Sequence, residues 1–157
     1  MRKFIVISIV LLMLAGFAIT SSADVVTLFA DQDVDVGTLT VEVIGTDLVV
    51  TYAITAPWVL GETHLYVGTS KPIKSAPGRF PYGPEDVVNG GVYIIDLSGF
   101  TETTILYIAA QAEVTHETEI DPDTEELREE TAWAEGLRIR PNKNWATYFT
   151  FTYVPPS

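Results

Sequence analysis

Apolar and polar side chains alternate with a period of two along much of this chain, which is typical of β-strands with one buried face. The pattern is clearest at residues 38–44, 48–55, 104–114 and 145–153. In the last of these segments, Trp145, Phe149, Phe151 and Tyr153 fall on the inward register. Apolar residues at helical spacing are nearly absent. We therefore expect an all-β fold.

The turns between these segments point to two facing sheets. Gly45, Thr46 and Asp47 separate two alternating segments and predict a hairpin. Further strands are expected at residues 25–29, 62–68, 92–97 and 131–134, with a Pro- and Gly-rich loop at 69–91 and an acidic loop at 116–130. About seven or eight antiparallel strands with inward aromatic residues predict a β-sandwich rather than a closed barrel.

The first 23 residues predict an export signal. Arg2 and Lys3 precede an uncharged run at residues 4–20, and Ser21 and Ala23 occupy the −3 and −1 positions of a signal-peptidase site. Cleavage before Asp24 is expected, which makes residues 24–157 a secreted domain. The alternative is a retained transmembrane anchor. The 17-residue run lies at the lower limit of the length that spans a bilayer core of about 30 Å. A lipoprotein anchor is excluded, because the chain has no Cys to carry the lipid.

Residues 24–157 have the length of one ordinary domain, which buries enough apolar surface to fold without a metal or a disulfide. The absence of Cys also excludes disulfides and redox chemistry. We expect a single domain that is stabilised by packing.

The charge balance excludes two classes of partner. The chain has 21 acidic and 9 basic residues, and loss of Arg2 and Lys3 with the signal takes its net charge from −12 to −14. A surface of this sign repels phosphate backbones and anionic headgroups. Nucleic acid and, after cleavage, the membrane are therefore not expected as partners, whereas cations and basic surfaces are compatible with this charge.

Residues 121–126 supply hard oxygen atoms of the kind that calcium prefers, and Ca²⁺ is the one cofactor that the sequence suggests. The candidate ligands are Asp121, Asp123, Glu125 and Glu126. Their spacing departs from the twelve-residue calcium loop, which needs Gly at its sixth position where this chain has Glu126. The alternative is a solvated acidic loop that keeps the domain soluble.

A second metal candidate includes both histidines. Glu62 and His64 lie two residues apart in an expected strand and share a face, and His116 is the other histidine of the chain. Zinc takes three or four N, S or O ligands, which these residues supply in part. A histidine that is hydrogen-bonded on a sheet face is the competing interpretation.

Signatures of catalysis are missing from the sequence. There is no Gly-x-Ser-x-Gly elbow, no Cys nucleophile and no phosphate-binding glycine loop. Paired carboxylates alone do not identify a hydrolase in a chain with 21 acidic residues. We therefore expect a protein that is not an enzyme.

One tryptophan and one loop form a candidate binding surface. Trp58 is expected to be exposed in a turn, where an indole stacks on sugar rings, whereas Trp133 and Trp145 are expected in the core. The loop after residue 69 places three basic side chains on an acidic protein, Lys71, Lys74 and Arg79. This basic spot is compatible with docking of a carboxylate-rich neighbour, including another copy of the same chain. The alternative is that the loop is merely a rigid connection between strands.

Five segments taken together resemble a group of secreted prokaryotic proteins. These segments are residues 62–70, 75–82, 107–110, 130–134 and 144–149, and the group also has a leading pair of strands like residues 38–41 and 48–52. The resemblance implies a location outside the cytoplasm and carries over no catalytic residue. Members of the group often have His where this chain has Gln111, so the resemblance does not support a metal site that needs an imidazole at that position.

Three functions fit these observations. The first is a non-enzymatic extracellular or cell-surface module with a structural or binding role, whose partner is a surface or matrix component. The second is a subunit of an extracellular fibre, in which residues 23–36 or 153–157 add a strand to the sheet edge of the next copy. The third is an exported metal-dependent hydrolase, which requires Glu62, His64 and His116 to meet in a cleft.

Overall fold

The computed structural model describes residues 23–157, which are almost entirely β-structure. Its strands are β1 (Ala23–Ala30), β2 (Val34–Ile44), β3 (Asp47–Ile54), β4 (Trp58–Gly68), β5 (Val92–Asp96), β6 (Thr104–Ile120), β7 (Leu127–Ala134), β8 (Leu137–Arg138) and β9 (Thr147–Tyr153). Two short 3₁₀ turns, η1 (Pro77–Arg79) and η2 (Pro84–Asp86), lie between β4 and β5. The all-β prediction is confirmed. The expected signal peptide lies outside the described residues, except that Ala23 begins β1.

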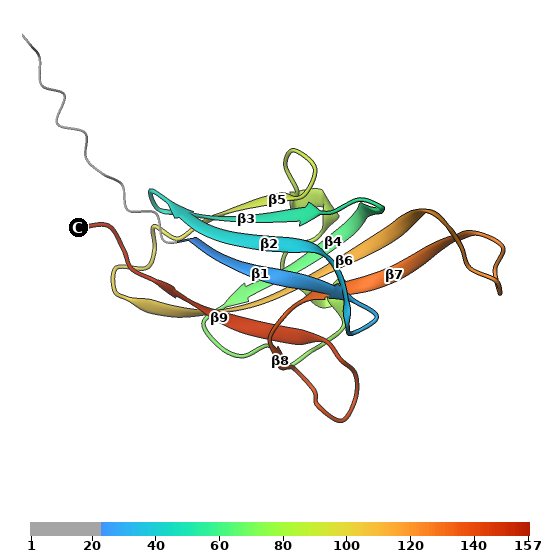
Figure 1. Ribbon diagram of the computed structural model, residues 1–157. Coiled ribbons are helices and arrows are strands. Elements are labelled where there is room, and N and C mark those ends of the chain that lie inside the picture. Colours follow the sequence, from blue (N-terminus) through green and yellow to red (C-terminus); the bar gives the residue numbers. More distant parts are fainter. Residues whose placement is uncertain (1–22) are drawn as a thin grey trace, which may run out of the picture.

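The strands form one antiparallel sheet that folds over on itself (Figure 1). Its order is β5-β3-β2-β1-β7-β6, and β6 also pairs with β9 and, on its other edge, with β4. The two halves of the sheet are joined where residues 28–30 of β1 pair with residues 132–134 of β7. The predicted hairpin at residues 45–47 is confirmed, because β2 pairs with β3 along its length. Among residues 23–157, no helix is long and apolar enough to cross a membrane.

Apolar side chains from both halves fill the space between them, as the β-sandwich prediction requires. Leu39 and Val50 come from one half and Leu65, Ile108 and Phe151 from the other, and each is at most 2% exposed. Burying one such side chain stabilises the fold by about 1.5–3 kcal/mol. The inward register expected for β6 and for the end of β9 is confirmed by the burial of the alternate residues there.

A second apolar cluster lies on the outer face of β6, β7 and β9. Its buried members are Ala109, Trp133, Ile139, Ala146 and Tyr148, with Tyr66, Phe80, Tyr107 and Trp145 packed against them. Two loops cover this face, residues 69–82 after β4 and residues 135–146 around β8. The expectation that Trp145 lies in the inner core is therefore wrong. The alternating backbone of β9 begins only at Thr147, so the parity of the strand does not extend back to Trp145.

Beyond the body of the fold, β6 and β7 continue as a projecting hairpin, residues 116–130, which we call the arm (Figure 1). The expected acidic loop at these residues is wrong in extent, because β6 runs to Ile120 and β7 begins at Leu127. Residues at the end of the arm are exposed on both faces, so charged side chains there hide the alternation that marks a half-buried strand.

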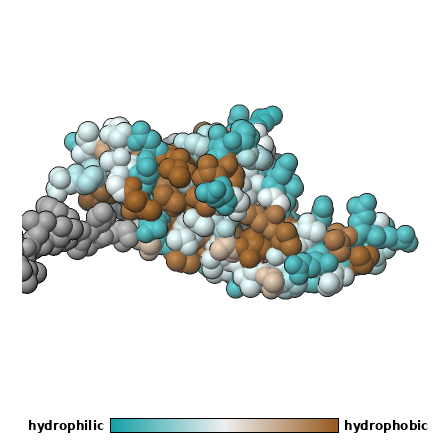
Figure 2. Space-filling model, turned by 90° about the horizontal axis from the view of Figure 1, so that it is seen from above, coloured by the Kyte–Doolittle hydropathy of each residue, from teal (hydrophilic) through white to brown (hydrophobic). Residues whose placement is uncertain are grey.

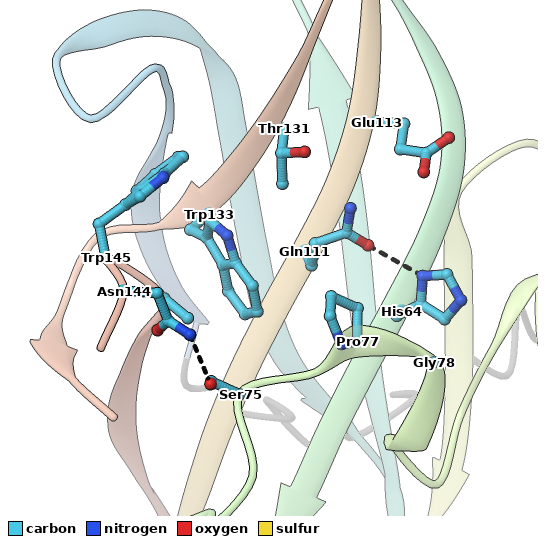
Figure 3. A pocket seen from close by; sticks show the side chains of 11 residues that line it. His64, Ser75, Pro77, Gly78, Gln111, Glu113, Thr131, Trp133, Asn144 and Trp145 are labelled. Atoms are coloured by element: carbon cyan, nitrogen blue, oxygen red, sulfur yellow. Dashed lines mark hydrogen bonds between the residues drawn. The ribbon is translucent and has the colours of Figure 1, made fainter. Parts of the chain in front are cut away.

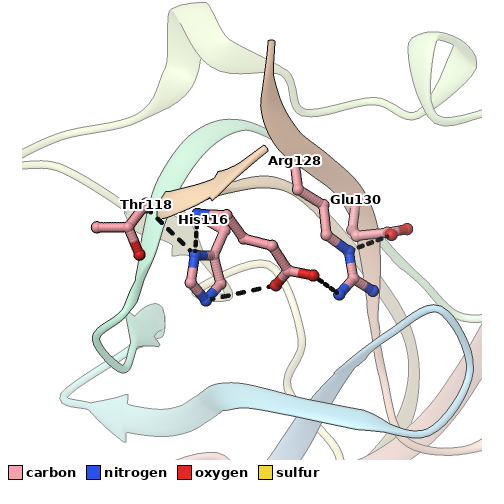
Figure 4. A network of polar contacts seen from close by, with 5 residues as sticks. His116, Thr118, Arg128 and Glu130 are labelled. Atoms are coloured by element: carbon pink, nitrogen blue, oxygen red, sulfur yellow. Dashed lines mark hydrogen bonds and ion pairs between the residues drawn. The ribbon is translucent and has the colours of Figure 1, made fainter. Parts of the chain in front are cut away.

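His116 holds a bulge at the base of the arm (Figure 4). The pairing of β6 with β7 shifts between Thr115 and Ile120, and Nδ1 of His116 accepts the backbone N–H groups of Thr118 at 3.3 Å and Glu119 at 2.9 Å. Its ring packs edge-on against Trp58, with ring centroids 5.0 Å apart. The imidazole therefore has a local structural role, since it satisfies backbone donors that the bulge leaves unpaired.

Arg128 closes the same network from the other strand of the arm (Figure 4). Its guanidinium lies 5.4 Å from the ring centroid of Trp58 and donates to Glu130 at 2.9 Å and to Glu119 at 3.1 Å. The hydrogen bond to Glu130 is the main cause that raises the pKa of Arg128 above its ordinary value. These contacts fix the direction in which the arm leaves the body.

Two buried tyrosines provide a matched pair for testing this packing. The hydroxyl of Tyr93 contacts the hydroxyl of Thr63 at 2.8 Å and two backbone carbonyls, whereas the buried hydroxyl of Tyr153 has no partner among residues 23–157. We expect Tyr93→Phe to lower the free energy of unfolding by about 1–3 kcal/mol, because the buried groups that contact the hydroxyl lose their hydrogen-bond partner. Tyr153→Phe is expected to be neutral or to stabilise by about 1 kcal/mol.

Urea unfolding followed by circular dichroism measures both effects. Equal losses in the two variants would mean that the hydroxyl of Tyr153 has a partner, in contradiction to the structure.

Candidate functional site

A cavity of about 390 Å³ opens on the outer face of the sheet, between the two loops that cover it. We call it the loop pocket (Figure 3). It is lined by His64, Ser75, Pro77, Gly78, Gln111, Glu113, Thr131, Trp133, Asn144, Trp145 and Ala146. Its volume lies in the range of about 300–1,000 Å³ that is usual for small-ligand sites.

The strand register builds the floor of the loop pocket. His64 of β4 pairs with Gln111 of β6, and Gln111 pairs with Trp133 of β7, so the three side chains form a row across neighbouring strands. The next outward pair, Glu113 and Thr131, lies one step along the same two strands. Sheet geometry alone therefore places an imidazole, an amide, an indole, a carboxylate and a hydroxyl on one face.

The polar side chains of the pocket floor already use some of their hydrogen-bonding groups within the protein. His64 donates from Nδ1 to Oε1 of Gln111 at 2.9 Å, which fixes the orientation of the amide. Gln111 is only 3% exposed, and Figure 3 shows its amide nitrogen turned away from His64, toward the side of Thr131 and Glu113. That nitrogen has no partner among residues 23–157, so it is available to donate a hydrogen bond to a ligand.

The two loops form the walls of the pocket and are tied to each other. Nδ2 of Asn144 donates to Oγ of Ser75 at 2.7 Å, a bond between residues 69 positions apart in the sequence. Trp133 is 5% exposed and packs edge-on against Phe80 at 6.0 Å between ring centroids. Trp145 is partly exposed and lies on the same side of the pocket as Trp133 and Asn144 (Figure 3). The walls are therefore aromatic in part, and they are held in place by a hydrogen bond between two lining residues and by packing against Phe80.

The expected calcium ligands lie at the tip of the arm, far along β6 from the loop pocket. Oδ1 of Asp121 accepts the backbone N–H of Asp123 at 2.8 Å and that of Thr124 at 3.3 Å, so this carboxylate closes the turn. Asp123, Glu125 and Glu126 are exposed. Among residues 23–157, no group of three His, Cys, Asp or Glu side chains is placed to hold a metal ion.

The three residues of the zinc candidate are not brought together. His64 lies opposite Gln111, whereas His116 lies five residues farther along β6 and packs on Trp58. Five residues of extended strand span about 16 Å, far more than two ligands of one zinc ion allow. Glu62 is exposed beside the register shift in β4.

The candidate binding surface is only partly where the sequence suggested. Trp58 is 8% exposed, so the expectation of an exposed indole in a turn is wrong. It begins β4, and both His116 and Arg128 cover its ring. The three basic residues of the first loop are exposed, and Nζ of Lys71 lies 5.3 Å from the ring centroid of Tyr148.

Of the polar residues of the loop pocket, the sequence singled out only His64, as a zinc candidate, and the position of Gln111, through the resemblance. Gln111 and Thr131 belong to strands, and Ser75 and Asn144 belong to loops with no motif. The available signal was the uncharged Ala109 and Gln111 on the outward register of β6, where a solvated strand face normally carries charge. That signal indicates a covered outer face, but it does not indicate which segment covers it.

Comparison with known proteins adds no assignment, since no protein-family model, no curated protein and no solved structure matches this chain.

Proposed function

We propose that this protein is a non-enzymatic extracellular module that binds an uncharged sugar residue of a surface or matrix polysaccharide in the loop pocket. The observation that carries the proposal is the pairing of Trp133 and Trp145 with a ring of neutral and acidic hydrogen-bonding groups in one cavity. Indole faces bind the apolar C–H faces of sugars, and amide, hydroxyl and carboxylate groups bind their hydroxyls.

The polar groups of the pocket suit a neutral polyhydroxylated ligand. Glu113 supplies carboxylate oxygens that accept strong hydrogen bonds from hydroxyls and repel anions. Gln111 and Asn144 supply amide groups on two sides of the cavity. A sugar ring needs such donors and acceptors around its edge and an apolar surface beneath it.

A binding role has more support than a hydrolytic one. Oγ of Ser75 contacts Asn144 and Nδ1 of His64 contacts Gln111, so neither is paired as nucleophile and base. The metal-dependent alternative needs Glu62, His64 and His116 in one cleft, and their positions along β4 and β6 keep the two histidines apart. The fibre alternative takes residues 23–36 or residues 153–157 as a donor strand, and the first of these segments is not free, because β1 already pairs with β2 along its length and with β7 at one end.

Titration of the purified protein with neutral oligosaccharides, followed by tryptophan fluorescence and calorimetry, tests the proposal. A panel of cello-, xylo-, malto- and chito-oligosaccharides covers the common linkages. We expect at least one series to bind, and we expect Trp145→Ala to weaken that binding about tenfold, which corresponds to about 1.4 kcal/mol of lost stacking. Trp145→Phe retains an aromatic face and is expected to lose less.

Trp58→Phe is the matched control for the fluorescence signal. Trp58 begins β4 and packs against the arm, outside the loop pocket, so its replacement should leave the affinity and the ligand-induced change intact. The proposal is wrong if no oligosaccharide binds, or if Trp145→Ala binds as tightly as the unaltered protein.

A further inference from the structure

Basic residues are gathered on one face of this acidic protein. Of the seven basic residues after position 23, six lie in residues 69–82 and 136–146, two segments without a single acidic residue: Lys71, Lys74, Arg79, Arg138, Arg140 and Lys143. By contrast, residues 113–130 contain nine acidic residues and one arginine. Figure 1 shows the arm projecting away from the body, whereas β8 and its loop lie on another side. The molecule therefore has an acidic arm and a separate basic face.

The basic face contains a cleft with an apolar interior. This basic cleft has a volume of about 250 Å³ and is lined by Tyr66, Ser70, Lys71, Pro72, Ile73, Lys74, Arg79, Phe80 and Pro81. Its three cations are exposed, and none of them forms an ion pair within residues 23–157. Ile73 on its rim is 86% exposed. An apolar side chain that is flanked by carboxylates has the chemistry to fill such a cleft.

The tip of the arm carries that chemistry. Ile120 and Leu127 face each other directly across the hairpin and are 53% and 42% exposed. The turn between them carries four carboxylates, Asp121, Asp123, Glu125 and Glu126. Figure 2 shows apolar surface next to strongly polar surface at the projecting end of the molecule. Two large apolar side chains exposed side by side at the end of a hairpin favour contact with another surface.

We propose that the arm tip of one molecule docks into the basic cleft of a second copy of this chain. Ile120 or Leu127 enters the cleft beside Tyr66 and Phe80, and the carboxylates of the tip face its cations. Within residues 23–157, the arm and the basic loops of one molecule make no ion pair with each other, and the arm projects away from the body of the fold (Figure 1). The contact therefore forms between molecules.

The two contact surfaces are different, so the arrangement is head to tail. A docked pair still offers one free arm and one free cleft, and such a heterologous contact builds an open chain unless its rotation closes a ring. The inference goes beyond sugar binding and does not depend on it, because the basic cleft and the loop pocket are lined by different residues.

Ionic strength sets the conditions for detecting this contact. The net charge of −12 opposes approach of two molecules at long range, but at about 0.1 M salt charges more than about 10 Å apart are screened. Ion pairs between the arm tip and the basic cleft are closer than this distance, so they persist at about 0.1 M salt and weaken at about 1 M salt. We expect the mass measured by light scattering to rise with protein concentration at 0.1 M salt and to fall toward that of the monomer at 1 M.

Charge reversal on each side provides the decisive test, on protein purified after expression of the full chain. The cleft variant carries Lys71→Glu, Lys74→Glu and Arg79→Glu, and the tip variant carries Asp123→Lys, Glu125→Lys and Glu126→Lys, which leaves the turn-closing Asp121 intact. Each variant alone is expected to associate at least tenfold more weakly. An equimolar mixture is expected to associate again, because every cleft then meets a tip of opposite charge.

A control variant with Asp24→Lys, Asp33→Lys and Glu102→Lys changes the net charge as much as the tip variant, at exposed positions outside the arm. It is expected to associate at least as well as the unaltered protein. The proposal is overturned if the unaltered protein stays monomeric at 0.1 M salt, or if the mixture of variants fails to associate. It is also overturned if the cleft binds an acidic polysaccharide such as polygalacturonate while the protein remains monomeric.

Discussion

Gly37→Ala is expected to lower the free energy of unfolding by about 3 kcal/mol or more, and the melting temperature by roughly 10 °C. Gly37 lies in β2 next to the register shift between β1 and β2, with a φ of 146°. A Cβ at this position overlaps the carbonyl oxygen of Ala53 in β3, which is backbone and has no rotamer to adopt. The substitution therefore combines a strained backbone with displacement of a central strand pair.

Gly45→Ala is the matched control for this effect. Gly45 has a φ of 64° in the β2–β3 turn, but a Cβ there has no atom within 4 Å. We expect a loss of only about 1 kcal/mol, from backbone conformation alone. Thermal unfolding followed by circular dichroism compares the two variants. Melting temperatures within about 2 °C of each other would show that steric overlap with β3 is not what requires glycine at position 37.

Gly136→Ala is expected to disable the loop pocket and to destabilise the protein by about 2 kcal/mol. A Cβ at Gly136 overlaps the carbonyl of Tyr148 in β9, so the segment that leads into β8 has to move away from β9. This segment continues into the wall that carries Asn144 and Trp145. Binding of the oligosaccharide is expected to weaken by about tenfold or more, with a change in the near-ultraviolet circular dichroism of the tryptophans.

Gly99→Ala is the control for Gly136→Ala, because a Cβ at Gly99 has no atom within 4 Å and this residue lies between β5 and β6, outside the loop pocket. It is expected to preserve both stability and binding. If Gly136→Ala lowers stability but leaves oligosaccharide affinity unchanged, the wall formed by residues 139–146 does not contribute to the site.

The inner core was predictable because one physical rule determines it. Leu106, Ile108 and Ala110 lie two residues apart along β6, and side chains at this spacing point to the same side of an extended strand. The rule gave a wrong answer for Trp145, which precedes the first extended residue of β9. It also gave too short a β6, because side chains in the arm are exposed on both faces.

The loop pocket was not predictable, since its residues meet only through strand register and loop docking. His64, Gln111 and Trp133 come together because three strands pair in one particular register, which hydropathy does not encode for an outer face. The bond from Asn144 to Ser75 joins two loops with no shared pattern. The burial of Trp58 has the same origin, because the side chains that cover it come from the arm.

The position of β1 between β2 and β7 has a consequence for the order in which this fold is made. Residues 28–30 complete their hydrogen bonds only with residues 132–134, so β1 keeps one unpaired edge until most of the chain has been synthesised. At about 5–20 residues per second, roughly 5–20 s pass between the synthesis of these two segments. During that interval the nascent chain exposes a strand edge that is able to pair with other chains.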